Sequence, residues 1–534
     1  MTNKKSLALV LLIIFATTAL FSGCGSKSAN NNTITMVEGT VKTLDPRKIG
    51  ESAGIHIADQ VWEGLTNSSE KSEAVPAGAE KWNVSADGLT YIFYLRKNAK
   101  WSDGSLVTAH DYEYSWKSAI APNFASTRVE DFTGIKNAME YNAGKAKIED
   151  VGVKAIDDYT LQVVLKAPRP FFPFECSGSS MKPVSKKACE ANSKAYGDPK
   201  TMLFNGPFKI SEYVHNSKYT CVRNDQYWDK VNVKPEKLVF VISEDAASVK
   251  TMLLTGQVDY IGDVYPPSDF EKLKKDGYIH TSPKLGVYHY IFNCKKKPFD
   301  DVRIRKAFAL SVNRQLLIDK VLKGGQKPAL AYVPYGMWDA NPGEDFRIVG
   351  GDFFKDNDVE TAKKLLAEAG YPDGKNFPEV SLKYNTSEGH KKIAEAIQEM
   401  WKDNLGINVK LVNVEWAVFQ TELDNHDFDI ARMGSIAGVP DASTFFDGQM
   451  PKGGSNYGNW ENSNFIKMYP ESQKLSDNAE RMRLMHEAEK MFIADDMADL
   501  PIYFYVNNNA VNPRLKGYVA DSMLNIYYKG AYKE

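Results

Sequence analysis

The 534-residue sequence predicts an α/β fold, and three observations support this prediction. Between residues 358 and 434, helix-type and strand-type patterns alternate with short loops, which is typical of parallel β-α-β units. In the first half, runs of alternating apolar residues lie between turn signals, which is typical of antiparallel strands. Near the end, "PIYFYVNNNAV" predicts one further strand.

The alternating segment starts with a helix that should end at Gly370, because its apolar residues recur at helical spacing: Ala362, Leu365, Leu366 and Ala369. Further elements follow in the order strand, helix, strand, helix, strand, with the sequences "EVSLKYN", residues 390–405, "INVKLVNV", "WAVFQTELDN" and "FDIARMG". This order predicts parallel strands joined by right-handed crossovers.

Ligands of open parallel sheets bind in the crevice beyond the carboxyl ends of the strands. In this segment two loops lie at those ends, residues 385–387 and the loop from Gly434 to Ala437. Both loops consist mainly of small and polar residues. We therefore expect a crevice there that the backbone of a ligand can approach closely.

The strands of the first half are expected in "LTYIFYLRKNAKW" and "DYTLQVVLKAP". Turns such as Asp87-Gly88 and Asp103-Gly104 lie among them. This region therefore predicts an α+β arrangement with an antiparallel sheet.

Residues 1–23 have the layout of a signal peptide. Lys4 and Lys5 precede an apolar run from Leu7 to Phe21, which is shorter than the ~20 residues that span a bilayer. The small residues directly before Cys24 resemble a bacterial lipobox, which implies cleavage before Cys24 and a lipid on its thiol. The alternative is an ordinary signal peptide followed by an unmodified cysteine. The polar residues 24–33 suit a flexible tether.

Composition excludes some partners and cofactors. The formal net charge is −2 and there is no basic block, which argues against nucleic acid. Four further cysteines show neither C-x-x-C pairs nor the spacing of metal ligands, so no metal is expected: Cys176, Cys189, Cys221 and Cys294. Cys176 and Cys189 could form a disulfide, or all four could be free thiols.

The pentapeptide Gly50-Glu51-Ser52-Ala53-Gly54 matches the G-x-S-x-G elbow of serine hydrolases. Such an elbow needs a buried strand leading into the serine, yet only Ile49 is apolar between the Asp45-Pro46 turn and Gly50. The sequence contains no H-E-x-x-H, Walker or dinucleotide motif. We therefore expect no enzyme and no cofactor, with a lipid-anchored hydrolase that uses Ser52 as the alternative from another functional class.

Several stretches together resemble the oligopeptide-binding protein family, the solute-binding lipoproteins of peptide ABC importers. They are "LTYIFYLRKNAKWSDGSLVTAHDYEYSWK", "NGPFKISEY", "RNDQYWD", "DDVRIRKAFALSVNRQLLIDKVLKGG", "KYNTSEGHKKIAEAIQEMWKDNLGINVKLVNVEW" and "PIYFYVN". The likeness covers nearly all of residues 34–534.

The resemblance implies a periplasmic-binding-protein-like II fold, with two lobes, a hinge and an extra inserted domain. Domain I would comprise residues 34–65, 203–290 and 505–534, the inserted domain II residues 66–202, and domain III residues 291–504. The chain crossings near 290 and 504 would form the hinge, and closure would bury the ligand between domains I and III.

The resemblance also implies ligand contacts. Gly50, Glu51 and Ser52 would lie along a bound peptide and pair with its backbone, which gives affinity without sequence preference. Further contacts would come from the loop and strand residues Asn385, His390, Arg432, Gly434 and Ala437, and from Phe124 in "NFASTR". A tyrosine of the closing strand would also contribute, namely Tyr505 or, as the alternative, Tyr503.

One departure from the family concerns the ligand's amino group. The family's loop carries an aspartate that pairs with the α-ammonium, but this chain has Gly438 there, and Ser435 where the family has an aromatic residue. Asp441 or Glu51 could replace the aspartate, or the ligand could lack a free amine. A nickel-chelate or metallophore receptor of the same fold is the alternative within the family.

The expected protein is thus a monomer on the extracellular face of the cell membrane, held there only by the lipid on Cys24. Its partners would be a peptide ligand and an ABC permease with its ATPase subunits.

Overall fold

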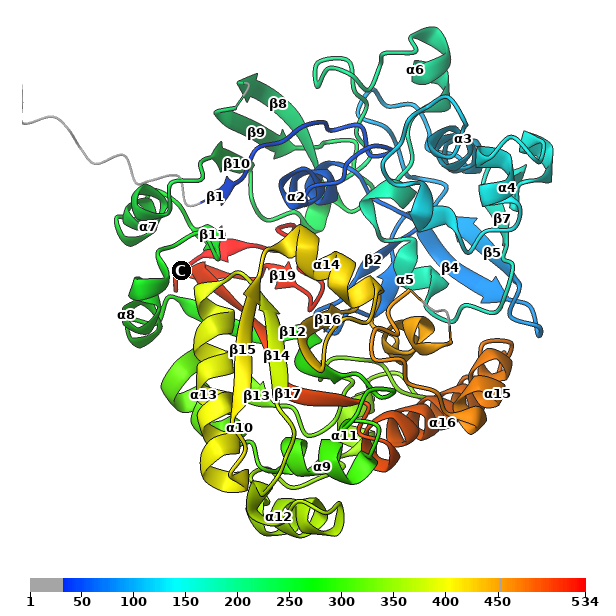
Figure 1. Ribbon diagram of the computed structural model, residues 1–534. Helices are drawn as coiled ribbons and strands as arrows, with labels where there is room; N and C mark the ends of the chain where they lie inside the picture. The colour runs from blue at the N-terminus through cyan, green and yellow to red at the C-terminus, as the bar shows by residue number, and fades with distance from the viewer. Residues whose placement is uncertain (1–31, 215, 452–453) are drawn as a thin grey trace, which may run out of the picture.

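The computed structural model describes residues 32–214, 216–451 and 454–534. Their largest element is an eleven-stranded mixed sheet that runs through both lobes (Figure 1). From one edge to the other its strands are β15 (Val409–Val414), β14 (Val380–Asn385), β16 (Ile430–Ile436), β12 (Ile279–Phe292), β17 (Asp499–Val511), β11 (Tyr260–Gly262), β1 (Thr33–Glu38), β10 (Lys237–Ile242), β9 (Lys218–Arg223) and β8 (Phe208–Val214), with β13 (Lys327–Pro328) paired to β17.

The β-α-β-α-β prediction is confirmed. Strand β14 pairs in parallel with both β15 and β16, and the connecting helices are α13 (Glu388–Leu405) and α14 (Trp416–Asp424). The preceding helix is α12 (Val359–Glu368). The three parallel strands are one edge of a mixed sheet, because β16 pairs antiparallel with β12.

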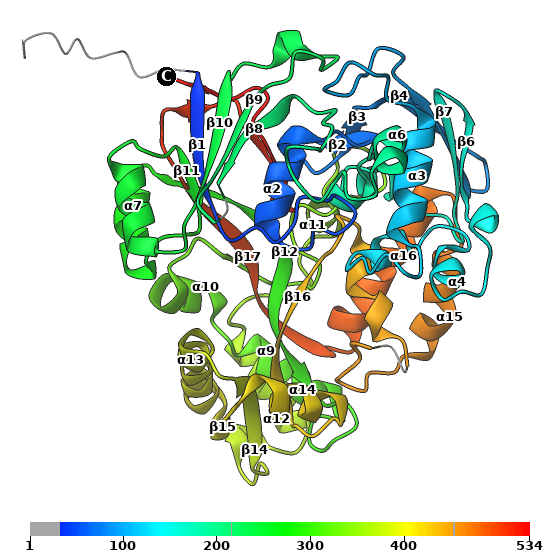
Figure 2. The ribbon, with the colours of Figure 1, turned by 90° about the horizontal axis from the view of Figure 1, so that it is seen from above.

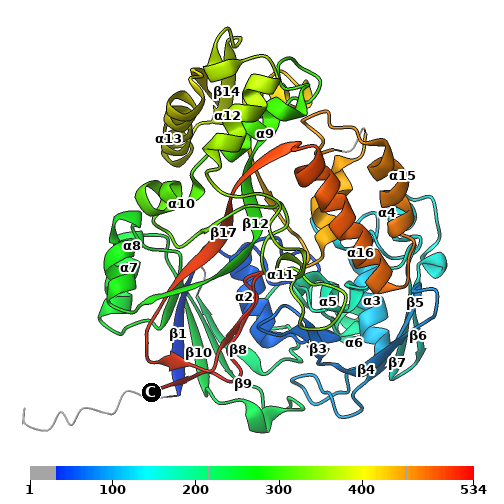
Figure 3. The same ribbon diagram turned by 90° about the horizontal axis from the view of Figure 1, so that it is seen from below.

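Two long antiparallel strands, β12 and β17, cross from one lobe to the other (Figure 3). Their pairing shifts register between Pro283 and Val287, opposite residues 504–506. The hydrophobic core divides at the same place: one core contains Leu285 to Phe504, and another contains residues from Ile34 to Tyr260 and from Val511 to Ala531. The chain therefore folds as two lobes that share one sheet.

The first lobe also contains a separate four-stranded antiparallel sheet, as the sequence predicts. Its strand order is β4 (Ala79–Val84), β5 (Thr90–Leu95), β7 (Thr160–Val164) and β6 (Val153–Asp157). Seen from above, α2 (Ser52–Val61) lies between this region and the strands β8, β9 and β10 (Figure 2). A small hairpin, β2 (Thr66–Ser68) with β3 (Ala74–Pro76), connects α2 to the four-stranded sheet.

The remaining longer helices cover the outer faces of the two lobes. They are α3 (Ala109–Ala119), α6 (Lys186–Ala191), α7 (Ala246–Leu254), α8 (Phe270–Lys275), α9 (Val302–Leu310), α15 (Ser463–Ser472) and α16 (Asn478–Glu489); shorter ones are α4 (Ala138–Asn142), α5 (Phe172–Glu175), α10 (Arg314–Leu317) and α11 (Phe346–Gly350). The chain ends in two short hairpin pairs, β18 (Leu515–Lys516) with β21 (Tyr532–Lys533) and β19 (Val519–Ala520) with β20 (Ile526–Tyr527).

The four described cysteines are free thiols, so the disulfide between Cys176 and Cys189 is not formed. Burial raises the pKa of the Cys176 thiol well above its usual value, which keeps it protonated. Among the described residues, no helix is long and apolar enough to cross a membrane. The expected signal peptide, the cleavage site and Cys24 lie outside the described residues.

A fully buried ion pair joins α2 to the segment that precedes α6. The ammonium group of Lys182 contacts the Asp59 carboxylate, and both side chains are almost completely removed from solvent. The second carboxylate oxygen of Asp59 has no hydrogen-bond partner within the described part of the chain. The pair therefore depends on Lys182 to compensate a buried negative charge.

We expect Lys182→Met to lower the free energy of unfolding by about 3–5 kcal/mol, because the Asp59 carboxylate then stays buried without its ion-pair partner. Denaturant unfolding measures the change. The matched control is Lys186→Met, which removes an exposed Lys186–Glu190 pair and should cost less than ~1 kcal/mol. Equal effects of the two substitutions would show that the buried pair is not important for stability.

Candidate functional site

The lobe formed around β14, β15 and β16 contains the partly buried guanidinium group of Arg432. Arg432 on β16 donates hydrogen bonds from Nη1 to the Asn385 Oδ1 atom and from Nη2 to the Tyr505 hydroxyl, each at 3.2 Å. Its Cζ atom lies 4.6 Å from the centre of the Tyr288 ring. Its Nε atom is buried and has no partner among the described residues. Arg432 also forms no ion pair with any described carboxylate.

Strand register brings these side chains together. Asn385 is the last residue of β14, Arg432 lies on the neighbouring strand β16, and Tyr288 lies two residues along β12 from the residue opposite Arg432. Gly434 leaves room for Tyr505: a Cβ atom at position 434 would lie 2.5 Å from the Tyr505 hydroxyl oxygen. A side chain there would displace the phenol from the guanidinium group.

His390 adds a neutral imidazole to the cluster. It lies in the first turn of α13, with Nδ1 3.3 Å from the Tyr288 hydroxyl and its ring stacked obliquely on the Tyr288 ring. Burial, followed by the nearby Arg432 charge, lowers the pKa of His390 to about 4. His390 is therefore uncharged at neutral pH.

The donors of this cluster suit a carboxylate. A guanidinium group presents several N–H donors in a plane that matches two carboxylate oxygens, and no described acidic side chain occupies it. The neutral imidazole and the phenols of Tyr288 and Tyr505 add further hydrogen-bonding capacity. The structure thus brings together five of the sequence-predicted residues: Asn385, His390, Arg432, Gly434 and Tyr505.

A hollow with a volume of about 610 Å³ lies in the other lobe. It is lined by the start of α2, the end of β1 and the middle of β17, including Glu51, Ser52, His56, Glu38 and Asn507. Lys284, on the crossing strand β12, also lines it, and its ammonium group lies 5.8 Å from the Tyr505 ring. The hollow and the Arg432 cluster are therefore neighbours across the register shift.

The G-x-S-x-G pentapeptide is a turn followed by a helix. Glu51 is extended (φ −108°, ψ 149°) and Ser52 is the first residue of α2, but no strand leads directly into them, since β1 ends at Glu38. Gly54 is needed for packing, because a Cβ atom there would lie 2.9 Å from both Ile49 and the Glu51 carboxylate. This geometry differs from a strand-to-helix nucleophile elbow, so the match does not support a hydrolase at Ser52.

His56 is engaged with another residue of the same hollow. Its Nδ1 atom lies 2.9 Å from the Glu38 carboxylate. Although burial opposes protonation, the Glu38 carboxylate raises the pKa of His56 above its usual value. The raised pKa favours the protonated imidazole, and the His56–Glu38 contact fixes the wall of the hollow beside Ser52.

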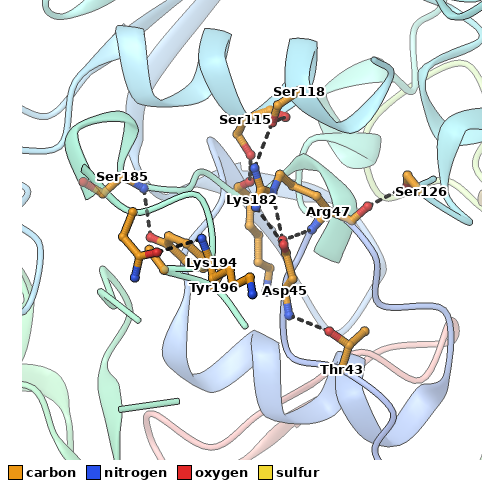
Figure 4. Close-up of polar contacts among 12 residues, drawn as sticks. Thr43, Asp45, Arg47, Ser115, Ser118, Ser126, Lys182, Ser185, Lys194 and Tyr196 are labelled. Atoms are coloured by element: carbon orange, nitrogen blue, oxygen red, sulfur yellow. Dashed lines mark hydrogen bonds and ion pairs between the residues drawn. The ribbon is translucent and has the colours of Figure 1, made fainter. Parts of the chain in front are cut away.

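The turn before Gly50 is fixed by buried polar contacts (Figure 4). Arg47 makes a bidentate contact with Asp45 at 2.7 and 2.8 Å and donates to the Ser118 hydroxyl at 3.1 Å. Ser126 donates to the Arg47 carbonyl oxygen at 2.6 Å. Phe124 packs here, with its ring centre 4.5 Å from the guanidinium carbon of Arg47. Phe124 therefore supports the segment that precedes Gly50 and is not part of the Arg432 cluster.

Asp441 is not available to a ligand, which corrects the sequence-based expectation. It is buried in a bidentate ion pair with Arg481, at 2.6 and 2.9 Å, and also accepts hydrogen bonds from the backbone and hydroxyl of Ser443. Ala437 is also occupied: its N–H donates to the Leu285 carbonyl oxygen at 2.7 Å, and its side chain is buried.

Two residues of this site were missed by sequence reasoning. Tyr288 and Lys284 belong to a strand whose apolar alternation indicates only core packing. The position of Tyr288 beside Arg432, and of Lys284 beside the Tyr505 ring, required the pairing of β12 with both β16 and β17. The one available signal was the alternation of polar and aromatic residues in "KLGVYHYIF", which puts Lys284, Tyr288 and Tyr290 on alternate positions of one strand.

Comparisons with known proteins agree with this fold. Residues 73–457 match the family model "Bacterial extracellular solute-binding proteins, family 5 Middle". The chain is 37% identical to the oligopeptide-binding protein OppA of Bacillus subtilis (strain 168), over 99% of each chain.

Solved structures resemble it to different degrees. The unliganded open form of the periplasmic murein tripeptide-binding protein MppA is 32% identical, with a TM-score of 0.87 over 95% of this chain and 98% of that one. The OppA of Haemophilus influenzae in complex with RPPGFSPFR is also 32% identical, but has a TM-score of 0.65 over 94% and 99% of the chains. Members of this family bind solutes and do not transform them. The chain belongs to the family 5 bacterial extracellular solute-binding proteins and has the two-lobed, periplasmic-binding-protein-like α/β fold of that family.

Proposed function

We propose that this chain binds peptides between its two lobes and delivers them to an ABC importer. The observation that carries the proposal is the Arg432 guanidinium on β16, which donates to Asn385 at the carboxyl end of β14 and has no carboxylate partner in the described chain. A peptide's terminal carboxylate would supply that partner and accept from the buried Nε atom. Relatives named as oligopeptide-binding proteins support a peptide as the ligand.

The arrangement of the lobes favours an open, ligand-free state. At the same sequence identity, the TM-score is 0.87 with an unliganded open relative and 0.65 with a peptide-bound one. Because the sequence identities are equal, we attribute the difference in TM-score to a different placement of the two lobes. We infer that closure rotates the lobes about the β12–β17 crossing at residues 283–287 and 504–506, where pairing is already interrupted. The three-domain limits given by the resemblance stay a prediction.

Gly50, Glu51 and Ser52 would contact the peptide backbone. Glu51 is extended, and Gly50 and Ser52 are exposed at the edge of the 610 Å³ hollow or just before it. An extended segment with exposed backbone groups can pair with any peptide, because every peptide carries the same N–H and C=O groups. The hollow is large enough for side chains of different sizes to be accommodated with water.

The first prediction concerns the carboxylate. Arg432→Met should weaken binding of a free-acid peptide by about 30-fold or more, corresponding to at least ~2 kcal/mol, because the charged partner of the carboxylate is removed. Binding of the same peptide as its C-terminal amide should change much less. Isothermal titration calorimetry measures both affinities.

Arg432→Lys is the matched variant, because it keeps the positive charge and removes the planar fork of donors. It should fall between the wild type and Arg432→Met. If the wild type binds free acids and amides equally, and Arg432→Met does not separate them, Arg432 is not the carboxylate site. If no peptide binds in any form, the peptide proposal itself is wrong.

The second prediction concerns the ligand's amine. With Asp441 bound to Arg481, Glu51 is the remaining candidate named from the sequence, and it lines the hollow. Its two carboxylate oxygens accept from the Lys42 N–H at 2.8 Å and from the Gly50 N–H at 3.4 Å, and their remaining lone pairs can accept from an ammonium group. Glu51→Gln should therefore weaken binding of free-amine peptides several-fold more than binding of their acetylated forms.

Calorimetry with pairs of free and acetylated peptides checks this expectation. Glu73→Gln, at a partly exposed position away from α2, is a control for the loss of one negative charge. Wild-type protein that binds both forms with the same affinity would remove Glu51 as an amine contact and favour ligands that are recognised without their amino terminus.

The remaining parts of the proposal concern location. A lipid on Cys24 would hold the protein at the extracellular face of the cell membrane, and the polar residues 24–33 would let both lobes reach the permease. Monomeric protein suits such delivery, since each molecule would present one cleft. The family's extracytoplasmic members support this location.

A further inference from the structure

A separate cavity lies on the face of β12 and β16 opposite to Arg432. Its volume is about 240 Å³, and its lining includes Ser435 and the exposed Ile436 at the end of β16. This is far more than the ~10–15 Å³ that holds one water, yet less than the ~300–1,000 Å³ of a site for a whole small molecule. The cavity therefore has the size of a compartment for one large side chain.

Three adjacent strands contribute a connected row of polar groups to this cavity. The Ser435 hydroxyl oxygen lies 3.0 Å from Nε2 of His289 and 3.1 Å from the Tyr332 hydroxyl. Nδ1 of His289 lies 2.8 Å from an Asp499 carboxylate oxygen, although outside hydrogen-bond geometry. The register explains the grouping: Ser435 is opposite Val287, and Asp499 is opposite Ile291, the residues two positions before and after His289.

The expected proton positions in this row leave one lone pair of the Ser435 hydroxyl oxygen free to accept a hydrogen bond. The Asp499 carboxylate favours a proton on Nδ1 of His289, so that Nε2 accepts from the Ser435 hydroxyl. Ser435 then accepts from the Tyr332 hydroxyl. A serine oxygen has two lone pairs, so one lone pair of Ser435 can still accept a hydrogen bond. His289 and Asp499 are buried and Ser435 is half-exposed, so Ser435 is the member that a ligand can reach.

The row contains the residue types of a hydrolase triad, but its setting suits binding. Ser435 lies within the ladder of β16 and β12, where backbone N–H groups are used for strand pairing. The N–H of Ala437, two residues on, also donates to a carbonyl, that of Leu285. Acyl transfer needs free donors for the developing oxyanion, and this ladder does not present them.

The other walls of the cavity are mainly aromatic. They include Tyr332, Phe445, Trp460 and Phe492, with Thr444 and Gln449 as polar neighbours. No lysine or arginine is among the described lining residues, whereas the acidic side chain of Asp499 is. An acidic side chain would therefore be disfavoured, whereas an aromatic ring that ends in a hydrogen-bond donor would match both the walls and Ser435.

We propose that this cavity is a side-chain subsite that selects a tyrosine-like residue of the bound peptide through the Ser435–His289–Asp499 row. The inference depends on the proposed peptide-binding function, since it names a preference within the same cleft. Ser435 has two roles: its small side chain leaves the cavity open, and its hydroxyl accepts from the ligand's phenol.

The experiment uses pentapeptides with a constant alanine-rich background and Tyr, Phe, Ala or Glu at each position in turn, titrated by calorimetry. At one position, we expect Tyr to bind at least about tenfold more tightly than Ala, from burial of the ring. Tyr should bind about threefold to tenfold more tightly than Phe, from one hydrogen bond. Glu should be the weakest of the four.

Two variants separate the roles of Ser435. Ser435→Ala keeps the cavity and removes the acceptor, so the Tyr-to-Phe affinity ratio should fall to about one while the Phe-to-Ala ratio stays. Ser435→Trp fills the cavity, so both ratios should fall towards one. Ser463→Ala removes an exposed hydroxyl at the start of α15 and should leave both ratios as in the wild type. Thermal unfolding checks that each variant is folded.

The other outcomes overturn the proposal in distinguishable ways. If peptides bind but no position prefers Tyr, or if Ser435→Trp keeps the preference, the subsite is wrong and peptide binding stands. If no peptide binds, both proposals fail. If mass spectrometry finds cleaved peptide or an acylated Ser435 after incubation, the row acts as a nucleophile system and the assignment to binding is wrong.

Discussion

The candidate ligand site depends on the positive charge of Arg432, which no carboxylate in the described chain neutralises. Arg432 is held by Asn385, Tyr505 and the face of Tyr288, but by no carboxylate in the described chain. Two other buried arginines have such partners, since Arg481 pairs with Asp441 and Arg347 with Glu489. Buried Arg305 instead donates to the backbone carbonyl oxygens of Asp496, Met497 and Phe299, whereas Nε of Arg432 has no acceptor among the described residues. A charge that is removed from water without a counter-charge raises the free energy of the protein. The same charge is therefore available to stabilise an anionic ligand. Burial, followed by this charge, lowers the pKa of His390 to about 4 and so keeps the imidazole neutral.

The shared sheet explains how one ligand could engage both lobes. Strands β12 and β17 carry residues of both the 610 Å³ hollow and the Arg432 cluster. Lys284 and Asn507 line the hollow, while Tyr288 and Tyr505 contact Arg432. The core divides at the register shift between them. A rotation at the register shift changes the distance between the 610 Å³ hollow and the Arg432 cluster. It leaves each core intact, since packed cores resist gradual deformation.

Sequence periodicity was sufficient for the parallel unit and for the antiparallel sheet of the first lobe, because both depend on local patterns. It was not sufficient for Asp441, whose partner Arg481 lies forty residues further along the chain on α16, so burial of the carboxylate could not be read from the loop itself. The row of Ser435, His289 and Asp499 was also missed, because its members come from three strands that only the sheet register makes adjacent. The G-x-S-x-G match is the converse case: a local pattern is present without its structural setting, and the single apolar residue between the Asp45-Pro46 turn and Gly50 already indicated this in the sequence.

Small-angle X-ray scattering of the protein with and without saturating peptide tests the central claim most directly, which is that two lobes close over a peptide whose carboxylate neutralises Arg432. The account predicts a smaller radius of gyration with a free-acid peptide, because closure brings the lobes together, and a smaller change with its C-terminal amide at equal occupancy. An unchanged radius of gyration at a peptide concentration that calorimetry shows to be saturating would contradict it.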